Sequence, residues 1–144
     1  MILLDTNAML SVLWNEIGAD EVADLLRDGN SAIPSPCLSE VVDQLIRCAG
    51  NPPASLGEKL TPMLDEVVAV LAVGSSVALR AGELRAAHYH RKTADLSLAD
   101  CILLASAGPS DEIATSDRAV AFTARELEIG VIPLPDSNGN RPAV

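Results

Sequence analysis

The sequence predicts an α/β fold, with one domain and a mostly parallel central sheet of about four to five strands flanked by helices. Short apolar runs alternate with longer stretches of helical pattern, which is typical of strand–helix–strand units. The chain has 144 residues, a usual length for one domain. Its composition, 49% hydrophobic and 21% charged, indicates a globular protein with a substantial core.

Strands are expected at short apolar runs, and helices where apolar residues recur with a helical period. The expected strands cover residues 2–4, 31–33, 112–115 and 131–134. The expected helices cover residues 20–28, 36–49, 56–66, 77–91, 98–107 and 119–127.

Local signals mark the ends of the early elements. The first expected helix has acids in its first turn, Arg27 in its last and Gly29 as a stop signal. Ser35 and Pro36 predict the next helix start, as an N-cap followed by proline at the first helical position. Residues 50–53, Gly-Asn-Pro-Pro, are the clearest break in the chain, but they are too few for a domain linker, so we expect a loop.

The later elements follow the same alternation. The helices over 56–66 and 77–91 flank an apolar segment, residues 67–73, whose pattern fits a strand and a helix continuation equally well. The tail over residues 136–144 is rich in Pro, Asn and Gly and is expected to be flexible. We therefore expect the domain to cover residues 1–135.

Charge and cysteine content limit the classes of function. The net charge of −10 opposes nucleic-acid binding, unless several acids gather at one site and bind divalent cations there. Three cysteines without metal-ligand spacing favour neither a disulfide framework nor a zinc site, so a reducing cytoplasm is expected. The start of the chain has no basic leader, and no apolar run has the length of a membrane span, so no membrane partner is expected.

Two aspartates stand where strands end. Asp5 directly follows the first expected strand, and Asp117 follows the strand over 112–115 with Ser116 between them. Ligands of open parallel sheets bind outside the carboxyl ends of the strands, so both carboxylates are candidates for one site. Acids at strand ends also serve as turn residues or helix N-caps, and this alternative is equally strong at each position.

Asp100 lies in a segment, residues 98–105, that is apolar on nearly every side and is therefore expected to be buried. A buried carboxylate must find a partner or bind a proton. Ser97 and Asp100 have the spacing of a capping box, in which the acid would bond the amide at the helix start. The capping role and a metal or catalytic role stay open together.

Glu40 carries the weakest local signal. A helical wheel places it opposite the apolar stripe of its helix, which favours a solvated surface residue. Its position early in the helix that follows the second strand would nevertheless bring it near the edge of the sheet where Asp5 lies.

Carboxylates that gather at one site repel one another, and they stay ionised at neutral pH only when cations lie between them. Oxygen ligands of this kind select Mg²⁺, with Mn²⁺ as a substitute. Such cations activate water and bridge a phosphate, so the residues indicate hydrolysis of phosphodiester bonds.

Four motifs together resemble the PIN domains, a ribonuclease family, and within it the VapC-type toxins of toxin–antitoxin pairs. The order and spacing of the motifs carry the resemblance, which spans nearly the whole chain. The motifs are Leu4-Asp5-Thr6-Asn7, Ser39-Glu40-Val41, Leu98-Ala99-Asp100-Cys101-Ile102-Leu103-Leu104-Ala105 and Ala114-Thr115-Ser116-Asp117.

The resemblance implies a Mg²⁺-dependent endoribonuclease. Asp5 and Asp100 would be the main metal ligands, and Glu40 and Asp117 would complete the catalytic site directly or through water. Residues that fall in the same motifs would orient ligands or water by hydrogen bonds: Thr6, Asn7, Thr115 and Ser116. The implied partners are an RNA substrate, a small antitoxin and a second copy of the chain in a homodimer.

Two other stretches attract attention. The apolar residues 9–14 either pack in the core or form a surface for a partner. The stretch from Arg80 to Lys92, which includes His88 and His90, is the most basic in the chain and would receive RNA phosphates or end a solvated helix. We prefer the solvated helix end.

Two functions of other classes remain alternatives. A phosphatase would use Asp5 as its nucleophile, although such enzymes commonly have a second acid two residues on, where this chain has Asn7. A non-catalytic module would use the acids to hold a cation or a basic partner.

Overall fold

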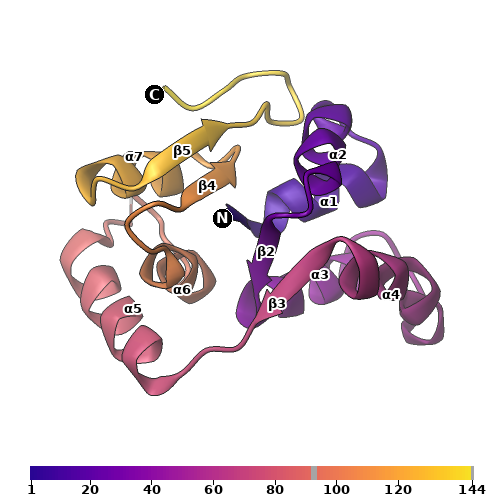
Figure 1. The fold of residues 1–144 in the computed structure, drawn as a ribbon, viewed down its shortest axis with the longest axis horizontal. Coiled ribbons are helices and arrows are strands. Elements are labelled where there is room, and N and C mark those ends of the chain that lie inside the picture. The colour runs from indigo at the N-terminus through magenta and orange to yellow at the C-terminus, as the bar shows by residue number, and fades with distance from the viewer. Residues whose placement is uncertain (92–93, 144) are drawn as a thin grey trace.

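The sheet is parallel throughout, as the alternation of strands and helices predicts. The computed structural model describes residues 1–91 and 94–143, so Lys92, at the end of the basic stretch, lies outside the described residues. Within them, five strands pair in the order β3-β2-β1-β4-β5, and each pairing is parallel. The predicted single α/β domain is confirmed (Figure 1).

The elements alternate along the chain. The strands are β1 (Ile2–Leu4), β2 (Ser31–Pro34), β3 (Val68–Leu71), β4 (Glu112–Thr115) and β5 (Gly130–Pro133). The helices are α1 (Thr6–Trp14), α2 (Ala19–Arg27), α3 (Ser35–Arg47), α4 (Leu56–Glu66), α5 (Ser75–His88), α6 (Leu98–Ser106) and α7 (Arg118–Glu126), with a short 3-10 turn, η1 (Pro53–Ser55). The apolar segment whose pattern fitted two structures forms β3.

The sequence pattern failed at two places in the first half. Helix α1 was not predicted, because its residues are apolar on nearly every side and show no helical period. Met9 and Leu10 in this helix are buried, which places them in the core. Ser35 is not the N-cap of α3: Pro34 takes that position in an extended conformation, because β2 runs into the helix without a loop.

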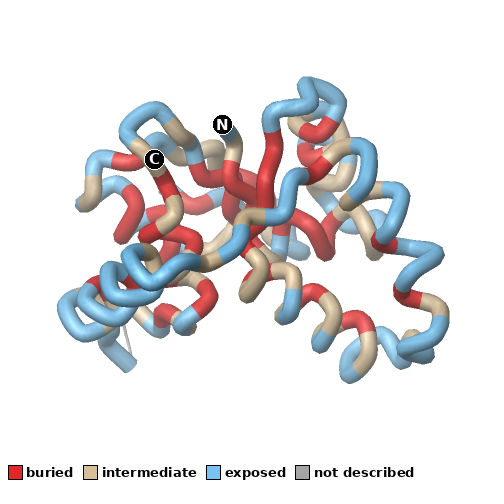
Figure 2. The backbone as a smooth tube through the Cα atoms, turned by 60° about the horizontal axis from the view of Figure 1, so that its bottom comes forward, coloured by how far each residue is buried: buried red, intermediate tan, exposed pale blue. Residues whose placement is uncertain are grey.

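The core lies around the three middle strands. Leu3, Leu4 and Ile33 are fully buried, and Ile113 of β4 is buried beside them. Figure 2 shows this buried backbone at the centre of the molecule, with the exposed segments around it. None of the helices in the described ranges is long and apolar enough to cross a membrane.

The topology brings β1, from the start of the chain, beside β4, from its last third, at the middle of the sheet. After β1 the chain moves outward through β2 and β3, and it then returns to place β4 on the other side of β1. The strand order therefore reverses between β1 and β4, where open α/β sheets bind their ligands. Leu4 pairs with Ala114, so the residues that follow these two strands emerge side by side.

The C-terminal segment contacts the body of the protein. Arg141 donates hydrogen bonds to both carboxylate oxygens of Glu21 on α2, at 2.9 and 2.5 Å, and to the carbonyl of Pro133 at 2.6 Å. Asp136 accepts from the amides of Asn138 and Asn140 and so closes a turn. The flexibility expected for residues 136–144 stays a prediction.

Candidate functional site

One hollow at the carboxyl edge of the sheet contains all four predicted acids. Its volume is about 270 Å³. The acids reach it from four places in the fold: the end of β1, helix α3, the first turn of α6 and the start of α7. The residues that line it are Asp5, Thr6, Asn7, Glu40, Asp43, Gln44, Arg47, Ser97, Asp100 and Asp117.

Asp5 is both a helix cap and a wall of the hollow. It caps α1 by accepting from the amide of Ala8 at 2.6 Å, and its second oxygen accepts from the hydroxyl of Thr115. The residue is 3% exposed. Burial raises the pKa of this carboxyl to about 7 against the effect of these two bonds, and the charges of Asp100 and Asp117 raise it further.

Asp100 also combines the two roles that the sequence left open. It forms a capping box with Ser97, whose amide donates to the carboxylate at 2.7 Å while its hydroxyl accepts from the Asp100 amide at 3.0 Å. The side chain is half-buried and still lines the hollow. Burial raises the pKa of the Asp100 carboxyl, and the charges of Asp117 and Asp95 add to the effect, although the bonds from Ser97 oppose it.

Glu40 turns toward α1 instead of toward solvent. The hydroxyl of Thr6 donates to its carboxylate at 2.8 Å and also contacts the carbonyl of Cys37 at 3.4 Å. Burial raises the pKa of Glu40, and the charges of Asp100 and Asp43 raise it further. The helical wheel described the helix in isolation, so it missed the neighbour that half-buries this side chain.

Asp117 caps α7 and is linked to Asp5 through a single side chain. Its carboxylate accepts from the amides of Ala119 at 2.6 Å and Val120 at 3.1 Å. Its own amide donates to the hydroxyl of Thr115 at 2.9 Å, and this hydroxyl donates to Asp5. Thr115 is fully buried, so it acts behind the hollow and not inside it.

The PIN domain family model matches residues 2–126. This chain belongs to the PIN domain family. PIN domains are generally nucleases that use divalent metal ions. The family resemblance found in the sequence is therefore confirmed. No curated protein matches the chain significantly.

Solved structures share the fold of this PIN domain at low sequence identity. FitAcB of Neisseria gonorrhoeae is 22% identical with a TM-score of 0.64, covering 92% of this chain and 96% of its own. VapBC2 of Rickettsia felis, bound to a promoter DNA fragment, is 16% identical with a TM-score of 0.62, covering 92% and 98%. DNA-bound VapBC of Salmonella typhimurium is 20% identical with a TM-score of 0.60, covering 91% and 96%.

Of the four residues that the resemblance marked as orienting groups, Thr6 and Asn7 line the acidic hollow of this PIN domain directly. Thr115 lies behind it. Ser116 lines a neighbouring hollow of about 240 Å³, and Asn7 borders both.

Three residues of α3 in the hollow were missed by the sequence analysis. Asp43, Gln44 and Arg47 follow Glu40 at intervals of three, four and seven residues, which places them on one face of the helix. The same periodicity would have identified them if Glu40 had been assigned to the site first. Among the described residues that line the hollow, Arg47 is the one cation.

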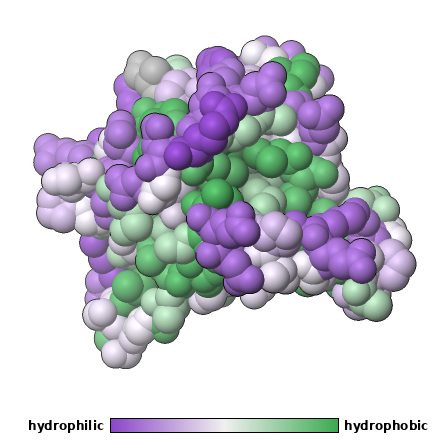
Figure 3. All heavy atoms as spheres, turned by 45° about the vertical axis from the view of Figure 1, so that its right-hand side comes forward, coloured by the Kyte–Doolittle hydropathy of each residue, from purple (hydrophilic) through white to green (hydrophobic). Residues whose placement is uncertain are grey.

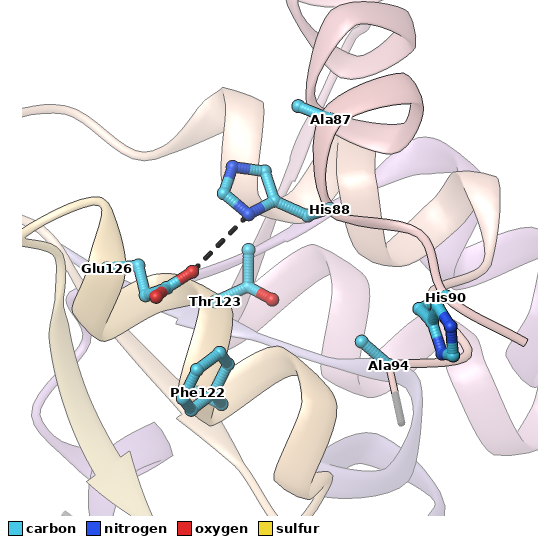
Figure 4. Close-up of a pocket in the computed structure, with 7 residues that line it drawn as sticks. All are labelled: Ala87, His88, His90, Ala94, Phe122, Thr123 and Glu126. Atoms are coloured by element: carbon cyan, nitrogen blue, oxygen red, sulfur yellow. Dashed lines mark ion pairs between the residues drawn. The ribbon is translucent and has the colours of Figure 1, made fainter. Parts of the chain in front are cut away.

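The described part of the basic stretch, residues 80–91, does not line the acidic hollow. His88 and His90 line a separate hollow of about 460 Å³ between α5 and α7, where the His88 Nδ1 lies 3.5 Å from the Glu126 carboxylate (Figure 4). Arg85 donates to the carbonyl of Leu96 at 3.2 Å and stacks over the ring of Tyr89 at 4.4 Å. These contacts tie Arg85 to the end of α5 and to the segment before α6.

The atoms that the acidic hollow offers as metal ligands suit a hard divalent cation. The residues that line it offer carboxylate, hydroxyl and amide oxygens, and include neither His nor Cys. A cation there would relieve the repulsion that helps to raise the pKa of Asp5, Glu40 and Asp100. In residues 1–91 and 94–143, no three His, Cys, Asp or Glu side chains are placed to hold one ion by themselves, so water would have to complete a coordination shell.

Proposed function

We propose that this PIN domain is a Mg²⁺-dependent endoribonuclease and the toxin of a toxin–antitoxin pair. The observation that carries the proposal is the hollow lined by Asp5, Glu40, Asp100 and Asp117, which the chain draws from four separate elements. A helix cap needs one carboxylate at one helix start. Four carboxylates that line one hollow repel one another and so oppose folding, unless a bound cation such as Mg²⁺ or Mn²⁺ offsets their charge.

Asp5 and Asp100 would be the main ligands, and Glu40 and Asp117 would complete the site directly or through water. When bound, the cation supplies an activated water and neutralises charge on the phosphate. The protein contributes position: Thr6 holds Glu40 on one side, and Thr115 fixes Asp5 relative to Asp117 on the other. Asn7 and Ser116 would orient water or RNA at the rim.

The proposed partners are RNA, a small antitoxin and a second copy of the chain. The antitoxin is supported by the likeness to the VapBC structures and to a toxin–antitoxin complex from Klebsiella pneumoniae. The Klebsiella structure is 20% identical with a TM-score of 0.57, covering 81% of this chain and 87% of its own. Figure 3 adds that apolar surface gathers on one face within polar margins, which is typical of protein interaction sites. An acidic hollow would attract an Arg or Lys of the antitoxin.

Three free thiols, one of them exposed, suit a cytoplasmic location.

The test is cleavage of a mixed pool of structured RNAs by the purified chain. Three reactions run in parallel: Mg²⁺, EDTA, and Mg²⁺ with Asp100→Asn, and the new RNA ends are sequenced. We expect cleavage only in the reaction that contains both Mg²⁺ and the unsubstituted chain, and the sequenced ends would then identify the target. Cleavage that survives both EDTA and the substitution would refute the metal site.

The two alternatives predict other results. A phosphatase would form a covalent aspartyl-phosphate at Asp5, which trapping of the phosphorylated chain would reveal. A non-catalytic module would bind Mg²⁺, measured by calorimetry, and leave every RNA intact.

Thr6→Val is expected to lower Mg²⁺ affinity or cleavage by about 10- to 100-fold, because it releases Glu40 without changing the charge of the site. Calorimetric titration and initial rates measure the two effects. The matched control is Thr61→Val, an exposed threonine on α4 that is expected to change neither. Equal values for both variants would show that Glu40 needs no support from Thr6.

A further inference from the structure

Helix α3 brings a single cation into the acidic hollow. Arg47 lies two turns after Glu40 on the same helix face, and both side chains line the hollow. The charges around it are the four acids and Asp43. An RNA strand that approaches this site meets a chain of net charge −10, and a cation bound between the acids offsets only part of that charge.

The guanidinium of Arg47 forms two hydrogen bonds with the carboxylate of Asp43. Its Nε donates to one oxygen of Asp43 at 2.7 Å, and its Nη2 donates to the other at 2.5 Å. These two bonds use two of the five N–H donors of an arginine. The pair lowers the pKa of the Asp43 carboxyl and raises the pKa of Arg47, so both groups keep their charges. The Arg47 side chain is 64% exposed, which leaves its outer donors accessible.

We propose that Arg47 binds a phosphate of the RNA backbone beside the scissile bond, with Asp43 orienting the guanidinium. The inference rests on the proposed function and deepens it by naming a substrate contact. A planar guanidinium with several aligned donors fits phosphate oxygens better than a point charge does. The position of the arginine at the rim places this contact next to the acids.

The alternative is a surface ion pair that stabilises α3 alone. The structure offers a control on α2, where Arg27 forms an ion pair with Asp24 three residues away and is similarly exposed. That pair joins the Arg27 Nη1 to one oxygen of Asp24, whereas Arg47 is bonded to both oxygens of Asp43. Arg27 does not line the acidic hollow. Arg27→Gln and Arg47→Gln therefore each remove one positive charge that is paired with an aspartate of the same helix, and they differ in whether the arginine lines the acidic hollow.

The experiment measures RNA binding in an Asp100→Asn background, which keeps the RNA intact. A fluorescein-labelled single-stranded RNA of random sequence is titrated with protein across a series of salt concentrations in Mg²⁺. Arg47→Gln is expected to weaken binding about fivefold at low salt. It should also flatten the slope of log affinity against log salt by about 0.7, the value for one lost phosphate contact to a single strand. Arg27→Gln should match the parent in both.

Arg47→Lys separates the effect of the charge from the effect of the planar guanidinium. Lysine retains the charge, so the salt slope should stay near that of the parent even where affinity falls. In the cleaving chain, Arg47→Gln should raise KM with little change in kcat.

Equal affinities and equal slopes for the two glutamine variants would overturn the inference, as would a parent that binds no RNA. If the parent binds RNA but the unsubstituted chain never cuts it, the proposed function alone would be overturned. In that case a difference between Arg47→Gln and Arg27→Gln would still support the phosphate contact.

Discussion

Asp5→Asn is expected to reduce RNA cleavage by more than about 100-fold. Substitution of groups that only orient metal ligands costs about 10- to 100-fold, and Asp5 is proposed as a ligand itself. Asparagine is nearly the same size and can keep both hydrogen bonds, because its oxygen accepts from Ala8 and its amide can donate to the hydroxyl of Thr115. The loss would therefore report the missing charge and not a collapsed site.

Initial rates with saturating Mg²⁺ measure this effect, and circular dichroism checks the fold of the variant. Asp65→Asn, an exposed aspartate on α4, removes the same charge outside the hollow and should keep full activity. Cleavage by Asp5→Asn within a factor of about ten of the unsubstituted chain would place Asp5 below the range for orienting groups and remove it from the metal site.

The second large effect concerns stability without metal. The free energy of unfolding of the chain in EDTA is expected to fall as pH rises from about 4 to about 7, relative to Asp5→Asn. The unfolded chain releases the Asp5 proton at an ordinary pKa of 3.8, whereas the folded chain keeps it until about 7. Between these values the folded state binds more protons, so each step to higher pH favours unfolding.

The size of this effect follows from the shift. One pKa unit corresponds to about 1.4 kcal/mol, so the whole shift corresponds to at most about 4 kcal/mol at and above pH 7. Below the ordinary pKa the carboxyl is protonated in both states, so the difference in stability between the two proteins should stop changing with pH. Burial raises the pKa of Asp100 and Glu40 as well, so these acids change the stability of both proteins in the same direction.

Urea denaturation followed by the fluorescence of Trp14, the single tryptophan, measures both proteins across this pH range. If Mg²⁺ binds the folded state as proposed, it should restore stability to the unsubstituted chain more than to the variant. A difference between the two that does not change with pH would contradict the burial of an ionisable group at Asp5.

Local signals were sufficient for most of the fold. The run Ile2-Leu3-Leu4, the acids and Gly29 around α2, and the alternation in the last third each determine an element through its own neighbours. Helix α1 was missed because it is covered on most sides. Its apolar residues face the core in several directions, and the helical period that reveals a surface helix is absent.

The sequence by itself predicted that Asp5 and Asp117 lie at one edge of the sheet, because the ends of parallel strands converge there. The family resemblance in the sequence added Glu40 and Asp100 to the predicted site. Only the tertiary structure decided the rest. It showed that Asp5 and Asp100 are caps and walls of the hollow at once, that Thr6 draws Glu40 inward, and that α3 adds Arg47. A side chain's burial and partners depend on elements distant in sequence, so no local pattern contains them.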